Sequence, residues 1–386
     1  MESHGQSLLA DRPQPVVADP LAPPRSTRDS AITVSRISGR GLTDEQICAW
    51  SKIQCGIKEL DSPFLHPHFT RSVAAVRSDV EVAALEQDGK MVGFFPYQRS
   101  RQVIGNPVGG RLNDCQALIA RADLRLDPSR MLGACGLLTW KFDHLLTTQS
   151  WFQASHWNLR RSLQIHVPER FDCSAAEGLR SRRVRETLRK TRKFERERGP
   201  IRFILHETDP RAFQALLRWK SAQYRRTDAM DIFSLRWPIE LLERLNQEPS
   251  VELCGQLSAL YLGDRLAAVH QGLRSNRVLH SWFPAYDPTI WQFSPGMMLF
   301  VRLAQEAESN GIARIDLGAG EAGFKQSLAS SATMVATGAV TRFALHRGAQ
   351  RGWNRTKAWL RTSPLQKPWR AVADRTRPLR DWFAMR

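Results

Sequence analysis

The chain has 386 residues, of which 42% are hydrophobic and 24% are charged, and its formal net charge is +18. This length predicts two or three domains, each large enough to bury a core. No apolar run approaches the roughly 18 residues that span a bilayer, and the first residues lack the pattern of a signal peptide, so we expect a cytoplasmic protein. Six cysteines without a CxxC spacing argue against a disulfide framework or a zinc site, and no metal is expected.

The excess of positive charge is concentrated in two segments. Residues 179–198 hold ten Arg or Lys and three Glu, and residues 347–386 hold eleven Arg or Lys and two Asp. The rest of the chain is nearly neutral, and no helix-turn-helix, RRM or zinc-finger pattern accompanies the charge. The composition therefore argues against a protein that binds nucleic acid across its fold.

A first domain is predicted over residues 31–174, after a proline-rich segment, residues 1–30, that we expect to be disordered. Its strongest local signal is a hairpin over residues 80–99, whose two strands are joined by an Asp-Gly turn. A helix is predicted from Leu42, capped by Thr43. The other predicted elements are strands at 31–37, 137–145 and 157–167 and helices at 69–76 and 127–136.

A second domain is predicted over residues 200–346, and residues 175–199 form a basic connecting helix. The predicted order is strand, two helices, three strands, helix, strand, helix and strand. This order indicates an α/β fold with a mixed sheet and helices on both faces.

The two halves share one motif. Residues 84–94 (ALEQDGKMVGF) align without a gap with residues 259–269 (ALYLGDRLAAV). In each half, a helix and then a strand follow this hairpin. The agreement in order indicates an internal duplication.

Longer motifs occur along both halves: PFLHPHF, FFPYQR, PVGGRLNDCQALI and WKFDHL, then WKSAQYRR, HSWFPAYDP, SPGMML and GIARIDLGAGEAGFK. In these motifs, residues 45–345 resemble the CelD/BcsL-type acetyltransferases of cellulose and exopolysaccharide biosynthesis, within the GNAT superfamily. The resemblance implies tandem GNAT-like domains in a Fem-like arrangement, with the second domain functional. It also implies acetyl-CoA or another acyl-CoA as co-substrate.

In a GNAT-like site, two parallel strands splay apart, and the acyl-CoA lies in the gap with its pyrophosphate over the start of the next helix. Ser294, Pro295, Gly296 and Met297 are predicted to begin that helix here. Ser294 suits a helix cap, Pro295 suits the first turn, and Gly296 lets a phosphate approach the backbone. We therefore expect these four residues to bind the cofactor, and a well-capped helix without a ligand is the alternative.

The predicted strand before Lys325 ends near Asp316, which is followed by Gly318 and Gly320. Asp316 is predicted to orient an amine or accept its proton, and Lys325 to bind a phosphate or stabilise an oxyanion. Gly318 and Gly320 permit tight turns beside a substrate. The same residues are also compatible with a turn-capping Asp and a solvated Lys.

Two histidines on adjacent predicted strands, His270 and His280, are candidate general bases, although a strand histidine is more often structural. By two-residue alternation, His280, Trp282 and Tyr286 share one face, which predicts a substrate wall or simple packing.

Asp114, Asp143 and His144 occupy corresponding places in the first half. That half lacks a Ser-Pro-Gly helix start and a following Lys, so we expect it to be structural or to bind substrate.

The C-terminal segment, residues 347–386, places Trp353, Trp359, Trp369 and Trp382 among its arginines. Arg-Trp segments of this kind lie on anionic membrane surfaces. Peripheral attachment at the inner face of the membrane, or contact with a polysaccharide synthase, is therefore one hypothesis. Packing on the domain and disorder stay open as alternatives.

These observations predict an acyltransferase that moves an acyl group from acyl-CoA to an amine or hydroxyl of a sugar or polysaccharide precursor. One alternative is a Fem-like transferase that uses aminoacyl-tRNA, whose phosphates the basic connecting helix would contact. Another is a non-catalytic regulator that keeps the GNAT fold and binds a synthase subunit.

Overall fold

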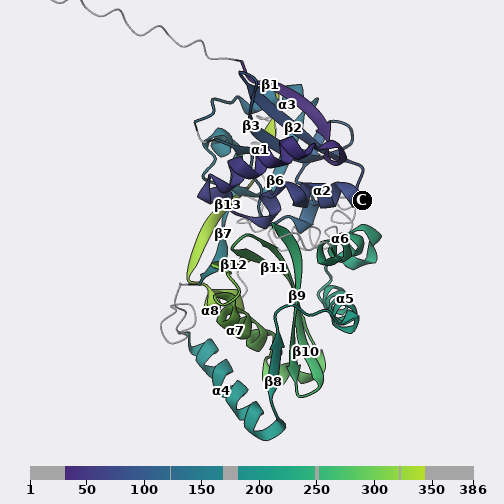
Figure 1. Cartoon of the computed structure of the whole chain (residues 1–386), viewed down its shortest axis with the longest axis vertical. Coiled ribbons are helices and arrows are strands. Elements are labelled where there is room, and N and C mark those ends of the chain that lie inside the picture. Colours follow the sequence, from purple (N-terminus) through teal and green to yellow (C-terminus); the bar gives the residue numbers. More distant parts are fainter. Residues whose placement is uncertain (1–30, 122, 168–180, 248–251, 321–322, 344–386) are drawn as a thin grey trace, which may run out of the picture. The chain divides into compact units, whose positions relative to one another are not determined.

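The computed structural model describes residues 31–121, 123–167, 181–247, 252–320 and 323–343 (Figure 1). The strands of the first half are β1 (Thr33–Ser38), β2 (Val80–Gln87), β3 (Lys90–Ser100), β4 (Ile104–Asn106), β5 (Ile119–Ala120), β6 (Thr139–Leu146) and β7 (His156–His166). Its helices are α1 (Asp44–Cys55), α2 (Pro67–Val76) and α3 (Pro128–Ala134).

The second half begins with α4 (Arg182–Arg198), which covers part of the predicted connecting helix. Its strands are β8 (Ile201–Ile204), β9 (Leu253–Leu262), β10 (Arg265–Ser275), β11 (Val278–Tyr286), β12 (Arg314–Ala319) and β13 (Ser331–Thr341). Its other helices are α5 (Pro210–Arg226), α6 (Arg236–Gln247), α7 (Pro295–Ala307) and α8 (Gly323–Leu328). The observed order agrees with the predicted one.

Local sequence sets most of the turns and helix ends. Asp88 and Gly89 join β2 to β3 with φ angles of 52° and 73°, the left-handed pair that a tight hairpin turn needs. Thr43 caps α1 in a reciprocal pair of hydrogen bonds with Gln46, so the predicted cap is confirmed.

The prediction that the side chain of Ser294 caps α7 is wrong. Ser294 has a left-handed backbone, with φ 57° and ψ 49°, and its side chain makes no capping hydrogen bond. The reason is the preceding 3-10 helix η8 (Pro288–Phe293), which ends at Ser294, so this residue turns the chain between two helices. Pro295 still occupies the first position of α7, as predicted.

The repeated hairpin has the same register in both halves. Leu85 pairs with Gly93 in the first hairpin, and Leu260 pairs with Ala268 in the second. Each register skips one residue next to this pair, so both hairpins carry a β-bulge at the equivalent point. An identical irregularity in both copies supports the predicted duplication.

The duplication extends beyond the hairpin. The offset of 175 residues that relates Ala84 to Ala259 also relates the bounds of β3 to those of β10, and the bounds of β7 to those of β13. Both halves thus close with an 11-residue strand at the same distance from their hairpins.

These two closing strands are exchanged between the halves. β13 pairs antiparallel with β6, β7 pairs antiparallel with β12, and β7 and β13 pair with each other. One 13-stranded sheet results, in the order β1-β2-β3-β4-β6-β13-β7-β12-β11-β10-β9-β8, with β5 beside β3. The division at residues 174 and 200 stays a prediction, and each predicted domain takes its last sheet strand from the other.

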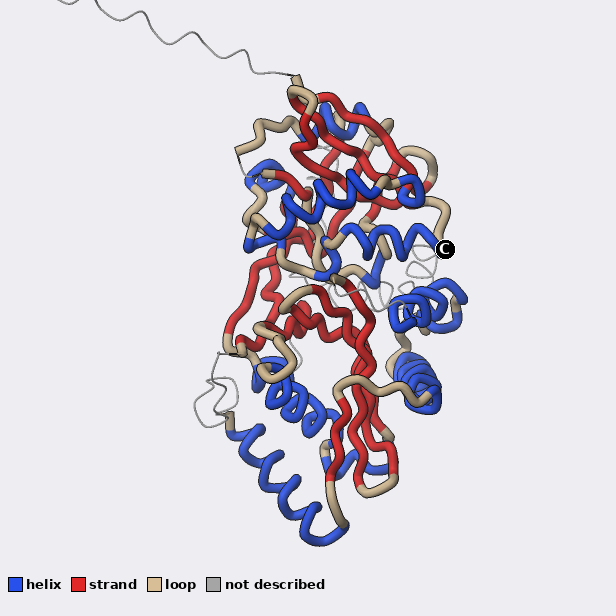
Figure 2. The backbone as a smooth tube through the Cα atoms, in the orientation of Figure 1, coloured by secondary structure: helices blue, strands red, loops and turns tan. Residues whose placement is uncertain are grey.

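Helices cover both faces of the second half of the sheet (Figure 2). One core combines α5 and α6 with β9 to β11, and it includes Phe69 and Val73 of α2 from the first half. Another combines α7 with β12 and β7 around Phe300, Leu303 and Ile315. The second core therefore packs β7 of the first half against α7 and β12 of the second.

The predicted N-terminal segment, the C-terminal Arg-Trp segment and residues 175–180 of the predicted connecting helix lie outside the described residues. Within the described ranges, none of the helices combines the length and the apolar composition that crossing a bilayer requires.

Candidate active site

The parallel strands β11 and β12 separate soon after they begin. They pair only at Val278–Arg314, Leu279–Ile315 and His280–Asp316. Beyond these pairs, β11 continues to Tyr286 and β12 to Ala319, and among the described residues no strand joins them there. The facing edges of the two strands are thus free to accept a ligand between them.

A cavity of about 490 Å³, here called the splay cavity, opens at this divergence. Its volume lies in the range of roughly 300–1,000 Å³ that is usual for small-molecule sites. The predicted cofactor residues Ser294 to Met297 line it at the start of α7, and so do Trp282, Tyr286 and Lys325. The structure therefore brings seven of the predicted site residues to one cavity.

The splay cavity is rich in positive charge. Arg183 of α4, Lys220 of α5 and Lys325 of α8 line it, against one carboxylate, Asp114, among the described lining residues. Lys220 Nζ donates to the carbonyl of Pro284 at 3.2 Å. Such a lining attracts an anionic ligand.

Burial and the nearby Lys325 together lower the pKa of Lys220 to about 8. Burial also lowers the pKa of Lys325, which the charge of Asp114 opposes. The sequence pointed to the motif WKSAQYRR but did not single out Lys220 as a site residue. Only its position beside β11 shows that it faces the cavity.

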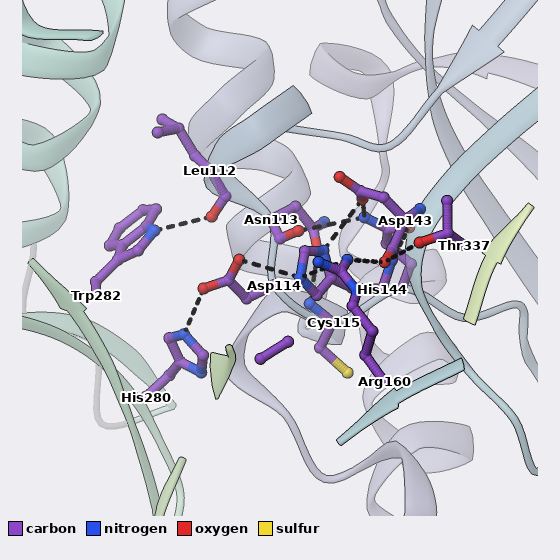
Figure 3. A network of polar contacts seen from close by, with 12 residues as sticks. Leu112, Asn113, Asp114, Cys115, Asp143, His144, Arg160, His280, Trp282 and Thr337 are labelled. Atoms are coloured by element: carbon purple, nitrogen blue, oxygen red, sulfur yellow. Dashed lines mark hydrogen bonds and ion pairs between the residues drawn. The ribbon is translucent and has the colours of Figure 1, made fainter. Parts of the chain in front are cut away.

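The carboxylate in the splay cavity belongs to the first half. Asp114 Oδ2 lies 3.1 Å from His280 Nε2 (Figure 3). Burial alone would raise the pKa of Asp114, but the hydrogen bond from His280 and the charges of His280, His144 and Lys325 outweigh it and hold this pKa at about 2. An ionised carboxylate only accepts hydrogen bonds, so Nε2 of His280 carries the proton in this contact.

Asp114 is also the start of a longer polar network. Its Oδ1 lies 3.9 Å from His144 Nε2, and His144 Nδ1 lies 3.2 Å from Asp143 Oδ1. Burial lowers the pKa of His144, but its contact with Asp143 and the charges of both acids outweigh it, so the pKa is raised. Arg160 of β7 and Thr337 of β13 donate to the carbonyl of Asp143, so the exchanged strands anchor this network (Figure 3).

Two other predicted catalytic residues lie elsewhere. Asp316 is buried and pairs with Arg314 at 2.9 Å, and it lines a second cavity rather than the splay cavity. His270 is fully buried, contacts Ser281 Oγ at 3.0 Å and lines neither cavity. Burial, together with the charge of His280, lowers the pKa of His270 to about 3, which argues for a structural role.

The matching protein family agrees with this geometry. Residues 181–326 match a protein-family model described as an acetyltransferase (GNAT) domain. The chain thus has a mixed α/β fold that contains a GNAT domain. The match supports an acyltransferase, and the CelD/BcsL type stays a prediction.

Solved structures match much of the chain. The C-terminal domain of a putative lysylphosphatidylglycerol synthetase from Agrobacterium fabrum is 11% identical, with 82% of this chain and 96% of that chain covered and a TM-score of 0.50. FemX is 9% identical over 70% and 89% of the chains, with a TM-score of 0.48. A tandem GNAT protein from the clavulanic acid pathway is 8% identical over 81% and 99%, with a TM-score of 0.44. The search of curated proteins returned no match.

The predicted substrate-binding glycines Gly318 and Gly320 stand at the end of β12 and line neither the splay cavity nor the cavity of Asp316. Gly318 has a φ of 75°, and a Cβ atom there would lie 3.2 Å from Asp114 Oδ2. The pairing of β12 with β7 also shifts register between Asp316 and Gly318. Gly320 has a φ of 134°, with Lys325 Nζ 3.8 Å from the position of its Cβ. The predicted need for glycine at Gly318 therefore has a physical reason: it lets the carboxylate of the first half approach the strand.

In the first half, Gln116 occupies the gap that corresponds to the divergence of β11 from β12. There the parallel strands β4 and β6 also pair over a short stretch, but Gln116 then bridges to Leu145 of β6. The side-chain oxygen of Gln116 accepts from the backbone N–H groups of Asp143 and His144 at 3.0 and 3.1 Å. These two amides are already bonded, so they are not available to an acyl group.

No cluster of three or more His, Cys, Asp or Glu side chains suited to a metal ion occurs in the described part of the chain.

Proposed function

We propose that the protein is a GNAT-type acyltransferase that binds acyl-CoA in the splay cavity. The observation that carries this proposal is the divergence of β11 from β12 next to the start of α7, with three cationic side chains around the opening. CoA carries phosphates at one end and a thioester at the other. A cationic helix start and an unpaired strand edge suit these two ends.

The residues around the splay cavity have different proposed roles according to their positions. The start of α7 has Pro295, which needs no hydrogen bond for its nitrogen, and Gly296, which has no side chain to exclude a phosphate. Arg183 and Lys220 add charge on the facing helices, and Lys325 stands nearest to the end of β12 through its hydrogen bond to the Ala319 carbonyl at 3.3 Å. Lys325 is thus placed to stabilise a developing oxyanion.

Asp114 and His280 supply the proton acceptor in this proposal. An imidazole that donates one ring N–H to a carboxylate is held in a fixed tautomer, and its other nitrogen is left to accept a proton. The acceptor nitrogen or oxygen attacks the thioester carbonyl carbon, the carbon–sulfur bond breaks, and CoA leaves as its thiol.

For the acceptor, we propose a sugar or a polysaccharide precursor, linked to cellulose or exopolysaccharide synthesis. The motif resemblance supports this link. The putative lysylphosphatidylglycerol synthetase and FemX resemble the chain in fold, and aminoacyl-tRNA as donor is the alternative outcome of the binding test.

The experiment is calorimetric titration with CoA and acetyl-CoA. Gly296→Trp places an indole in the splay cavity, where a Cβ atom would already lie 3.4 Å from Tyr286, and we expect it to abolish binding. Gly41→Trp is the matched control, because Gly41 is exposed and its Cβ would meet only ordinary contacts near 3.7 Å. If the wild type bound no CoA but bound tRNA in a salt-sensitive way, the proposal of an acyl-CoA donor would be wrong, and aminoacyl-tRNA would be the donor instead.

A further inference from the structure

A second cavity of about 410 Å³, here called the polar cavity, shares Asp114 with the splay cavity. It lies where β11, β12, β7 and β13 meet, and residues 58–62 of the first half close it. His280, 2% exposed, lines it as well. The pair Asp114–His280 therefore stands between the two cavities, where two substrates would have to meet.

The base of the polar cavity is a row of polar residues on neighbouring strands. His280 of β11 pairs with Asp316 of β12, Asp316 with Gln164 of β7, and Gln164 with Ser331 of β13. Residues that pair directly across strands share one face of a sheet. This row exists only because β7 and β13 are exchanged.

The polar cavity carries the opposite charge from the splay cavity. Four carboxylates line it, and two cationic side chains oppose them: Glu59, Asp61, Asp114 and Asp316, with Lys58 and Arg314. The ion pair between Arg314 and Asp316 offsets one charge of each sign, which leaves Glu59, Asp61 and Asp114 against Lys58. Burial raises the pKa of Asp61, although the charge of Arg314 opposes this. A buried carboxyl of this kind gains from a cationic partner.

Neutral hydrogen-bonding groups make up much of the rest of the lining. Ser162, Gln164 and Thr333 present hydroxyl and amide groups to the polar cavity. Ser62 also lines it, and its buried hydroxyl lies beside the thiol of Cys115, another lining residue. Hydroxyl and amide side chains such as those of Ser162, Gln164 and Thr333 both donate and accept hydrogen bonds, as the hydroxyl groups of a sugar do.

We propose that the polar cavity is the acceptor site and that its ligand is an amino sugar, a polyhydroxylated molecule with a primary ammonium group. This inference rests on the proposed acyltransferase function and adds the substrate class. The carboxylates attract the ammonium group, and the serine, threonine and glutamine side chains match sugar hydroxyls. The anionic donor and the cationic acceptor are thereby sorted into separate cavities by charge.

The transfer balances with the groups at hand. The ammonium group gives one proton to His280, which passes it to solvent. The amine nitrogen then bonds to the thioester carbonyl carbon, the carbon–sulfur bond breaks, and the second nitrogen proton leaves with the sulfur as CoA thiol. The products are an N-acyl amino sugar and CoA.

The test measures thiol release from acetyl-CoA with three acceptors. Glucosamine has the amine and the hydroxyls, glucose lacks the amine, and cadaverine lacks the hydroxyls. We expect kcat/KM for glucosamine to exceed the other two at least tenfold, because leaving buried polar groups unpaired weakens binding by about that factor. Equal turnover of cadaverine would overturn the recognition of a sugar.

Two variants tie the effect to the polar cavity. Asp61→Asn removes a charge and Ser162→Ala removes a hydroxyl, and each is expected to raise KM for glucosamine about tenfold while KM for acetyl-CoA and kcat stay within twofold. Asp264→Asn, in the turn between β9 and β10, is the control and should change neither KM. Unchanged KM for glucosamine in both cavity variants would overturn the placement of the acceptor.

The two proposals fail separately. If the wild type binds acetyl-CoA but transfers no acetyl group to glucosamine, the amino-sugar inference is wrong and the acyl-CoA proposal stands. If acetyl-CoA does not bind, both are wrong.

Discussion

Asp114 and His280 are 166 residues apart in the chain and 3.1 Å apart in space. The first is contributed by the non-splayed half, in the segment before β5, and the second lies on β11 at the last pair before the strands separate. The site of the second GNAT half is therefore completed by the first half.

Replacing Asp114 tests this pair. Asp114→Asn keeps the size of the side chain but leaves His280 without a carboxylate, so we expect kcat to fall roughly hundredfold, the usual order for losing general-base assistance. Affinity for CoA should not fall, because the variant removes a negative charge from a cationic cavity. Steady-state kinetics and calorimetry measure the two effects.

Asp123→Asn, at an exposed ion pair, is the control. A kcat equal to that of the wild type would exclude a role in proton transfer.

Lys220 makes CoA binding depend on pH. Its pKa of about 8 means that the free protein loses this charge as the pH rises through 8. A bound phosphate raises that pKa, so affinity is constant well below pH 8 and then falls by at most about tenfold per pH unit until the bound form also deprotonates.

Calorimetry between pH 7 and 9.5 checks this dependence. Lys220→Arg keeps its charge throughout and should flatten the curve, and it also corrects for titration of CoA itself. Parallel curves for the two proteins would show that Lys220 does not contact the phosphates.

A comparison of alanine variants at Gly318 and Gly263 distinguishes the effect of backbone strain from that of crowding against Asp114. Gly318→Ala forces a side chain into a left-handed conformation and places its Cβ 3.2 Å from the Asp114 carboxylate, whereas Gly263→Ala, at φ 61°, meets nothing within 4 Å. Both variants should lose about 1–2 kcal/mol of unfolding free energy from strain. Only Gly318→Ala should lose activity, measured as kcat at saturating acetyl-CoA. Equal activity of both variants would contradict the close approach of Asp114 to β12.

Buried neutral histidines make the fold sensitive to acid. Burial lowers the pKa of His270 to about 3 and that of His66 to about 4. The unfolded chain binds these protons near pH 6.5, so the stabilisation is complete above pH 6.5 and is lost as the pH falls toward the folded pKa values.

His270→Gln removes one of the two titrations. Its unfolding free energy should fall less steeply between pH 6 and 4, by up to about 1.4 kcal/mol per pH unit relative to the wild type. Urea unfolding at several pH values measures the slopes. An unchanged slope would mean that His270 is reached by solvent in the folded protein.

Much of the fold follows from short-range sequence. The Asp88-Gly89 turn, the Thr43 cap and Pro295 at the first turn of α7 each depend on residues a few positions apart, and all three occur as predicted. The prediction that Ser294 caps α7 was wrong because its conformation depends on the preceding helix η8, which the sequence pattern of a helix cap does not include. The repeated hairpin was visible because both copies keep their turn and apolar positions.

Tertiary structure alone decided how the halves combine. The alternation along β7 and β13 predicts strands but not their partners, since any neighbouring strand satisfies the same backbone hydrogen bonds. The exchange places Gln164 beside Asp316, and the packing of the halves brings Asp114 to His280 and Lys220 to the splay cavity. The sequence by itself determined the GNAT-like elements and the half expected to carry the chemistry. The polar partners of that half come from residues far away in the chain, which only the folded sheet brings together.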